Sequence, residues 1–231
     1  MSRTRSILLC VALAGALVSC DTARKLAPQD LGPAANSPAG AVQRLGWAFD
    51  HRDVDAIAGL LAADLQFQTF ETDSAGNGGG GSRVGWTRDS VLVALRSLFD
   101  GVPGVSGPAT VSLSLDPNLV AFPDTRVGMN PTWHKTVRST ADLRVADPAS
   151  GSRFEVTGYL LFYLTRGDSA AIPTDQLALG ARADSARWWI DRLDDETLSG
   201  IGARAAPART NPSHQMTFGG ILRMYLDRTR R

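Results

Sequence analysis

The chain has 231 residues, a hydrophobic fraction of 43% and a formal net charge of +1, so it can bury a sizeable core and carries no marked excess of charge. The lack of a basic patch argues against nucleic acid as a partner. Both cysteines, Cys10 and Cys20, lie near the N-terminus, so the rest of the chain has no thiol for a disulfide or a metal.

The N-terminus combines a positive segment with a short apolar run. Arg3 and Arg5 precede the run, which covers residues 7–18 and is too short to span a bilayer comfortably. It ends in Leu17-Val18-Ser19-Cys20, which resembles the lipobox of bacterial lipoproteins. The resemblance implies cleavage before Cys20 and acyl chains on its thiol and amine, and more than one acyl chain is what stable anchoring needs.

This resemblance predicts a lipoprotein signal peptide at 1–19 and a lipidated flexible tether at 20–36, rich in Ala and Pro and without hydrophobic periodicity. The expected partner is a membrane of the bacterial cell envelope, reached through the lipid on Cys20. An ordinary secretory signal is the alternative. A folded domain at 37–196 and a C-terminal extension at 197–231 follow.

Three helices are predicted early in the domain. Ser37-Pro38 is a typical helix start, a capping hydroxyl followed by proline in the first turn. A second short helix is predicted at Val54–Ala62. Thr87 can cap a third helix at Arg88–Phe99. Helical spacing places these apolar residues on one face of the first helix: Val42, Leu45, Ala48 and Phe49.

Strands are predicted at 64–70, 109–115, 119–122 and 187–193, with Asp194-Asp195-Glu196 closing the last one. The glycine-rich segment Gly76–Ser82 lacks the lysine and the following helix of a phosphate-binding loop, so it is interpreted as a hairpin tip. Gly167–Ala183 is interpreted as a polar connection.

The longest predicted strands, Trp133–Val145 and Phe154–Thr165, form an antiparallel hairpin around a turn near Ala149-Ser150. Period-2 alternation then sorts the side chains into two faces, and Arg144 lies opposite Glu155. The expected core face carries Val137, Ser139, Ala141, Leu143 and Val145 opposite Phe162, Leu160, Gly158, Val156 and Phe154. The outer face carries an unusually apolar centre, an expected homodimer interface formed by Tyr159, Leu161 and Tyr163.

The C-terminal extension contains a short amphipathic helix. Its apolar side chains have helical spacing, with several arginines nearby. Such a helix can touch anionic lipid or dock on its own domain, and we favour docking. The residues with this spacing are Phe218, Ile221, Leu222 and Tyr225.

The order helix, helix, strand, short strand, helix and four longer strands resembles the nuclear transport factor 2-like, or SnoaL-like, fold. Two local segments carry the resemblance, Ala48–Asp64 with its acidic break between two helices and Arg187–Arg192 as the last core strand. The resemblance covers Ser37–Glu196. It implies an α+β fold in which three N-terminal helices pack on a strongly curved antiparallel sheet, forming a cone with a pocket at its wide end. An unrelated α+β sandwich is the alternative.

Small residues at the centre of the hairpin could make room for a ligand in such a cone. Ser139, Ala141 and Gly158 cluster there on the core face. Alternatively, the glycine lets the strand bend or admits a bulky neighbour. The expected pocket lining is Trp47, Phe67, Trp86, Ser139 and Gly158.

Enzymes of this superfamily place an Asp, His or Tyr inside the cone as a general base or oxyanion donor. The predicted register places the residues that could act as a general base or oxyanion donor on the outer face of the hairpin. Asp191 is the exception, and it is expected to pair with an arginine. We therefore predict no catalytic residue. The three histidines have no ligand spacing, so neither a metal nor a cofactor is expected. The candidates considered are His134, Asp142, Tyr159, Tyr163 and Asp191.

These observations predict a membrane-anchored envelope lipoprotein whose non-catalytic domain binds a small apolar ligand or a protein. The alternative is a SnoaL-like isomerase, dehydratase or cyclase acting on a small apolar substrate in the cone. Its only support is analogy of fold, which is a weak guide to function.

Overall fold

The computed structural model describes residues 32–71, 82–183, 186–198 and 216–230. The predicted signal peptide, Cys20, most of the predicted tether and the glycines of the predicted hairpin tip lie outside these residues. Among the described residues, no helix has the length and apolar character needed to cross a membrane.

The described part of the chain forms an α+β domain of helices packed on one sheet. The helices are α3 (Pro38–Asp50), α4 (Val54–Ala58), α5 (Arg88–Asp100), α6 (Thr174–Ala178) and α7 (Phe218–Arg228). The strands are β1 (Leu61–Glu71), β2 (Ser82–Trp86), β3 (Thr110–Leu115), β4 (Ala121–Pro123), β5 (His134–Ala146), β6 (Arg153–Arg166) and β7 (Trp188–Leu198).

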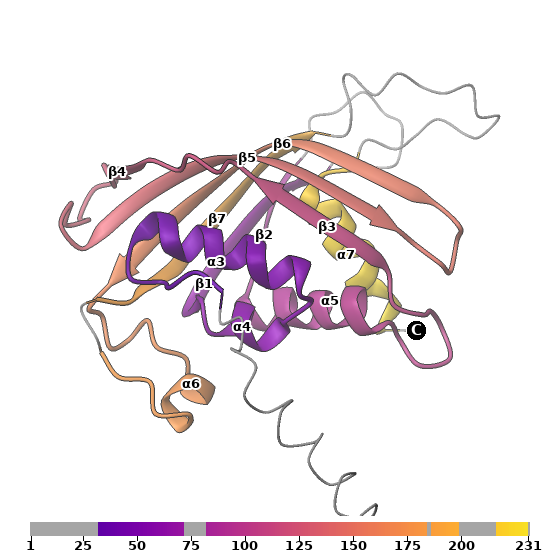
Figure 1. Ribbon diagram of the computed structural model, residues 1–231, viewed down its shortest axis with the longest axis horizontal. Coiled ribbons are helices and arrows are strands. Elements are labelled where there is room, and N and C mark those ends of the chain that lie inside the picture. Colours follow the sequence, from indigo (N-terminus) through magenta and orange to yellow (C-terminus); the bar gives the residue numbers. More distant parts are fainter. Residues whose placement is uncertain (1–31, 72–81, 184–185, 199–215, 231) are drawn as a thin grey trace, which may run out of the picture. The chain divides into compact units, whose positions relative to one another are not determined.

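The strands form a single mixed sheet in the order β2-β1-β7-β6-β5-β3, and β4 pairs with the start of β5. All neighbours are antiparallel except β1 and β7, which run parallel. The sheet curves strongly, and α3, α5 and α7 lie on its concave side (Figure 1). The predicted fold class is confirmed, with the parallel β1–β7 pair as the departure from an all-antiparallel sheet.

The central hairpin has the predicted register. Val145 pairs with Phe154, Ala141 with Gly158, and Arg144 lies opposite Glu155. The predicted core face is largely buried, whereas the other face is exposed or half-buried. Gly158 has a φ of 147°, which residues with a side chain rarely adopt, so its backbone favours the interpretation as a bend.

The predicted helix starts are confirmed. Ser37 Oγ accepts from the Gly40 N–H at 3.0 Å, and Thr87 caps α5. The second helix is shorter than predicted, ending at Ala58 instead of Ala62. The reason is sheet pairing, since the Leu60 carbonyl accepts from the N–H of Ile190 on β7 and β1 begins directly afterwards.

β7 is longer than predicted and contains a bulge. Leu164 pairs with Ile190 but Tyr163 pairs with Arg192, so Asp191 is an extra residue in the strand. Before the bulge even-numbered residues face the helices, and after it odd-numbered ones do, which buries Asp195. The prediction that Asp194-Asp195-Glu196 closes the strand is therefore wrong, because the pairing continues to Leu198.

The paired tryptophans at the start of β7 belong to two separate clusters. Trp188 joins the main core on the concave side. Trp189 packs in a second cluster with Ala62, Ala171 and Ile172, where the segment after β6 covers the opposite face of the sheet. The predicted polar connection thus also shields part of the sheet.

Helix α7 docks on the domain, as favoured from the sequence. It packs against α5, β1 and β7, and its apolar side chains belong to the main core. The buried residues of α7 are Phe218, Gly219, Ile221, Leu222, Tyr225 and Leu226.

Candidate functional site

Within the described residues, the interior between the sheet and the helices contains a small apolar cavity of about 20 Å³. Side chains from α3, α4, α5, β1, β7 and α7 line it, and none is ionisable. The lining residues are Leu45, Phe49, Ile57, Leu61, Leu65, Phe67, Val91, Leu95, Leu193, Phe218 and Leu222.

Of the predicted pocket residues, only Phe67 lines this cavity. Trp86 contacts the Phe67 ring, with 5.8 Å between ring centroids. Trp47 stacks on His51. Ser139 is buried, where its hydroxyl accepts from the Asp116 N–H at 2.9 Å and donates to a backbone carbonyl. Gly158 is half-buried at the bend of β6.

Helix α7 packs against the interior beside this cavity. The Phe218 ring lies 5.9 Å from the Phe49 ring and 6.1 Å from the Phe67 ring, measured between centroids. Leu222 contributes to the same cavity wall. The first two turns of α7 therefore supply part of the apolar packing of the interior.

A buried carboxylate holds the N-terminal end of α7. Asp195 Oδ2 accepts from the Gly219 N–H at 2.7 Å and from the Thr69 hydroxyl at 2.8 Å. The other oxygen, Oδ1, accepts from the Thr197 backbone N–H and hydroxyl, and that hydroxyl accepts from the Phe218 N–H at 2.7 Å. Asp195 and Thr197 thus satisfy N–H groups that the first turn of a helix leaves without partners.

A second buried carboxylate holds the C-terminal end of the same helix. Asp147, at the turn of the central hairpin, accepts from both terminal nitrogens of Arg228 at 2.9 and 2.6 Å. Tyr225 and Ser150 also donate to Asp147. The Arg228 hydrogen bonds hold the pKa of Asp147 well below its usual range. Burial and the Asp147 charge raise the pKa of Tyr225 to about 12.

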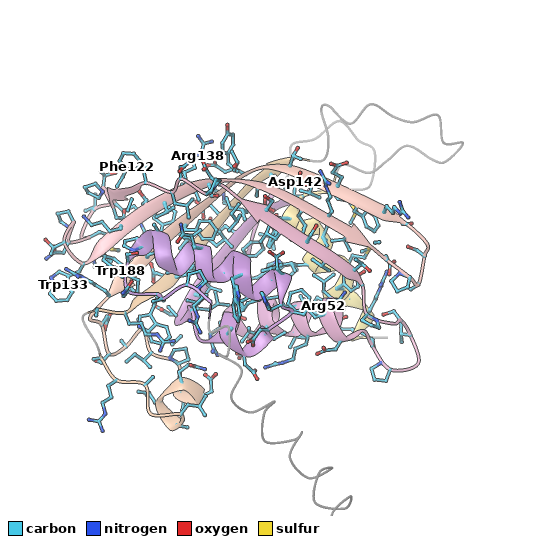
Figure 2. All side chains as sticks on the ribbon, viewed as in Figure 1. Arg52, Phe122, Trp133, Arg138, Asp142 and Trp188 are labelled. Carbon is cyan, nitrogen blue, oxygen red and sulfur yellow. The ribbon has the colours of Figure 1, made fainter. Side chains whose placement is uncertain are left out.

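The outer face of the sheet carries tyrosines covered by guanidinium groups. The Arg138 guanidinium lies 4.0 Å from the centre of the Tyr159 ring. Arg126 and Arg192 lie 4.1 and 5.1 Å from the centre of the Tyr163 ring. These separations are within the range of cation–π attraction. Tyr159 remains 43% exposed, and Figure 2 places Arg138 on the convex side, away from the helices.

Ion pairs surround these rings and balance the charge of the outer face. Arg138 pairs with Glu196 at 2.8 Å and Arg192 with Asp194 at 2.7 Å. Leu161, between the two tyrosines along β6, is half-buried. Tyr159, Leu161 and Tyr163 thus lie on the outer face, bordered by ordered charges of both signs.

A cluster of charged residues lies where the loop after β4 meets β7. Arg126 makes a bidentate contact with buried Asp124, at 2.7 to 3.1 Å, and reaches Asp191 at 3.5 Å. Burial would raise the pKa of Asp124, but Arg126 outweighs it and the pKa is lowered. Burial and the nearby Asp64 charge raise the pKa of Asp191. The expected pairing of Asp191 with an arginine is confirmed.

The other considered acid–base candidates do not converge on the interior. The His134 ring lies against the Asn130 backbone at the start of β5, and Asp142 pairs with Arg144 at 3.0 Å. Tyr159 and Tyr163 lie on the outer face. Within the described ranges, no group of three or more His, Cys, Asp or Glu side chains could hold a metal ion.

The sequence reasoning missed the residues that position α7. Asp195 and Asp147 lie in segments that look like a polar strand end and a turn, which are normally solvated. An available signal was the spacing in α7 itself, because Arg228 follows Tyr225 by three residues and so extends the docking side of the helix.

No protein-family model and no curated protein matches the chain. Solved structures that resemble it include a protein of unknown function from Mycobacterium tuberculosis, at 12% identity and a TM-score of 0.43, with 83% of this chain and 85% of that chain covered. A ketosteroid isomerase-like protein from Erwinia carotovora atroseptica SCRI1043 has 14% identity and a TM-score of 0.40, with 73% and 95% covered.

A nuclear transport factor 2-like superfamily protein from Salmonella enterica serovar Typhimurium has 12% identity and a TM-score of 0.41, with 74% of this chain and 93% of that chain covered. At such identities the likeness concerns the fold alone. The described domain is an α+β fold with N-terminal helices on a mixed, mainly antiparallel sheet, and its structural neighbours include nuclear transport factor 2-like proteins.

Proposed function

We propose that the protein is a lipid-anchored lipoprotein of the bacterial cell envelope, whose domain binds a second copy of itself through the outer face of the sheet. The observation that carries the choice of surface is the position of α7. It fills the interior and leaves a cavity of about 20 Å³, whereas the opposite face of the sheet presents ordered aromatic side chains.

The interior favours neither the predicted small apolar ligand nor the isomerase, dehydratase or cyclase alternative. Ligand pockets usually measure about 300–1,000 Å³, and the cavity has room for roughly one water molecule. A ligand would have to displace Phe218 and Leu222. General acid–base catalysis would also need an ionisable group within reach of the substrate, and the cavity lining has none.

The outer face has the composition of a protein interface. Tyrosine and arginine are enriched at interfaces, where a ring offers a large contact area at low entropy cost. Here the guanidinium groups already lie over the rings, so less side-chain freedom remains to be lost on binding. The mixture of signs around Tyr159 and Tyr163 suits a two-fold dimer, because an isologous interface brings each patch against its own copy.

The proposed anchor rests on the sequence around Cys20. Arginines, a short apolar run and Leu17-Val18-Ser19-Cys20 occur in the order of a lipoprotein signal, and a polar segment separates the cysteine from the first helix of the domain. This arrangement would hold the domain close to the membrane surface and restrict copies to two dimensions. That restriction raises their effective concentration and favours the proposed dimer.

Sedimentation of the soluble domain, residues 32–231, tests the interface. Leu161→Arg should convert a dimer into a monomer, because it adds a like charge at the centre of each apposed patch. Val93→Arg is the matched control, since Val93 is an exposed apolar residue on α5, away from the sheet. A wild-type monomer at high protein concentration, or equal effects of the two variants, would contradict the proposed interface.

Membrane fractionation of the full chain tests the anchor. Cys20→Ala should release the protein and abolish its metabolic labelling with palmitate. Cys10→Ala is the control and should remain membrane-bound and labelled, since Cys10 lies within the predicted signal peptide. Retention and labelling of the Cys20→Ala variant would refute lipidation at this residue.

A further inference from the structure

Arg166, the last residue of β6, has an environment unlike that of the arginines on the outer face. Its guanidinium lies 5.1 Å from the centres of both the Trp133 and Trp188 rings. The backbone fixes this arrangement, because Arg166 pairs with Trp188 across β6 and β7 and its N–H donates to the Trp133 carbonyl at 3.1 Å. Figure 2 shows both tryptophans at the same end of the sheet.

The Arg166 side chain has no hydrogen-bond acceptor among the described residues. Its Nε is buried, and none of its side-chain nitrogens makes a hydrogen bond or ion pair with the described residues. By contrast, Arg126, Arg138 and Arg192, which lie over tyrosine rings, each hold a carboxylate. A buried donor without a partner costs free energy, and such a group in a folded protein calls for an explanation.

The surroundings hold the guanidinium in place. Gly167 has a φ of +70°, and a Cβ there would lie under 3.0 Å from atoms of the Trp133 ring, so only glycine lets this indole lie against the backbone beside Arg166. Trp188 is buried, and its backbone N–H donates to the Ala35 carbonyl at 2.9 Å. Both indole rings thus lie within cation–π range of the guanidinium.

We propose that Arg166, between Trp133 and Trp188, is a binding site for an anionic group, a carboxylate or a phosphate. The planar edge of a guanidinium matches both groups through two parallel hydrogen bonds. Because the rings already restrict the side chain, little conformational entropy is lost when the anion binds. The guanidinium is also partly buried, which strengthens its attraction to a negative charge.

The site is independent of the proposed outer-face dimer. Trp188 belongs to the core on the concave side of the sheet, and Trp133 precedes β5 at the end of the hairpin far from its turn. Trp133 is 38% exposed, so an anion can approach along the rim of this indole.

The test is a titration of the protein with inorganic phosphate and with acetate at constant ionic strength, followed by tryptophan fluorescence and calorimetry. Saturable binding is expected for the wild type. Arg166→Met should weaken it by roughly tenfold or more, the loss expected for one charge-assisted hydrogen bond. Arg166→Lys keeps the positive charge but loses the paired N–H donors of the planar guanidinium, and it should weaken binding less than Arg166→Met.

Arg153→Met is the matched control, because Arg153 begins the strand that Arg166 ends and is exposed. It should bind as the wild type does. Saturation by phosphate alone assigns a phosphate ligand, and saturation by acetate alone assigns a carboxylate. Failure of both anions to saturate the wild type overturns the proposal, as does an equal loss in Arg153→Met, which would indicate general charge attraction. Circular dichroism checks that each variant is folded. If Arg166→Met is unfolded, the binding measured for Arg166→Lys decides the test.

Discussion

Two adjacent glycines in α7 allow a sharp test of how this helix docks. A Cβ added at Gly219 would lie under 3.0 Å from three side-chain atoms of Thr69 on β1. A Cβ added at Gly220 would meet its nearest neighbour, Thr217 Oγ1, at 3.5 Å, which is ordinary contact. Gly219→Ala and Gly220→Ala therefore make the same chemical change in the same helix turn, and only the first is expected to be overpacked.

The expected effects have opposite signs. Replacing glycine by alanine in a helix stabilises it by up to about 1 kcal/mol, and this gain applies at Gly220. At Gly219 the same gain is outweighed by overpacking, which costs about 1–3 kcal/mol. Overpacking would push α7 away from Thr69 and so lengthen the hydrogen bond from the Gly219 N–H to Asp195. We expect the two variants to differ by about 2 kcal/mol in the free energy of unfolding.

Urea unfolding followed by circular dichroism measures this difference as a shift of the midpoint at constant slope. Thermal midpoints should separate by roughly 4–8 °C, since 1 kcal/mol corresponds to about 2–4 °C in a domain of this size. If Gly219→Ala proves as stable as Gly220→Ala, α7 does not approach β1 closely in solution. That result would contradict the conclusion that α7 packs into the interior of the domain.

Three further variants probe the same helix by urea unfolding. Phe218→Ala should cost about 3–5 kcal/mol, and benzene should raise its thermal midpoint by occupying the new cavity; no benzene effect would indicate collapse of the site. Asp195→Ala should cost about 1–3 kcal/mol for each buried donor left without an acceptor, and an unchanged midpoint would contradict the cap at the start of α7. Asp147→Asn should cost about 3–5 kcal/mol by leaving Arg228 without its counter-charge. Folding lowers the pKa of Asp147 from an unfolded value of about 3.9, so the stability that its charge contributes is complete above roughly pH 4 and is lost as the pH falls further. Asp147→Asn should therefore flatten the dependence of stability on acid pH. An acid dependence like that of the wild type would refute this expectation.

The central hairpin could be predicted to the residue because two independent patterns agree. Alternation along each strand sets the faces, and opposite charges at Arg144 and Glu155 fit only one register. A slip of one residue would expose Val137 and Phe162. Helix starts were equally predictable, since capping hydroxyls at Ser37 and Thr87 act over three residues of sequence.

The predictions that proved wrong or incomplete depend on contacts between residues distant in the sequence. α4 ends early because the chain from Leu60 pairs with β7, far along the chain. Asp195 is buried because α7 supplies N–H donors to it, and no local pattern distinguishes such an aspartate from a solvated one. For the same reason the sequence could suggest a pocket behind Ser139 and Gly158 but could not show that α7 fills the interior.

The extra residue in β7 has a consequence for how this strand tolerates change. Asp191 shifts the alternation, so that Asp194 pairs with an arginine on the outer face while Asp195 receives the start of α7. Deleting Asp191 would remove the bulge and keep both faces, whereas deleting Asp194, outside the bulge, would turn Asp195 outward and bring Glu196 toward the helix. The strand can therefore lose the extra residue at Asp191 without changing its faces, but a one-residue change in length after the bulge would exchange the faces of the segment that holds the C-terminal helix.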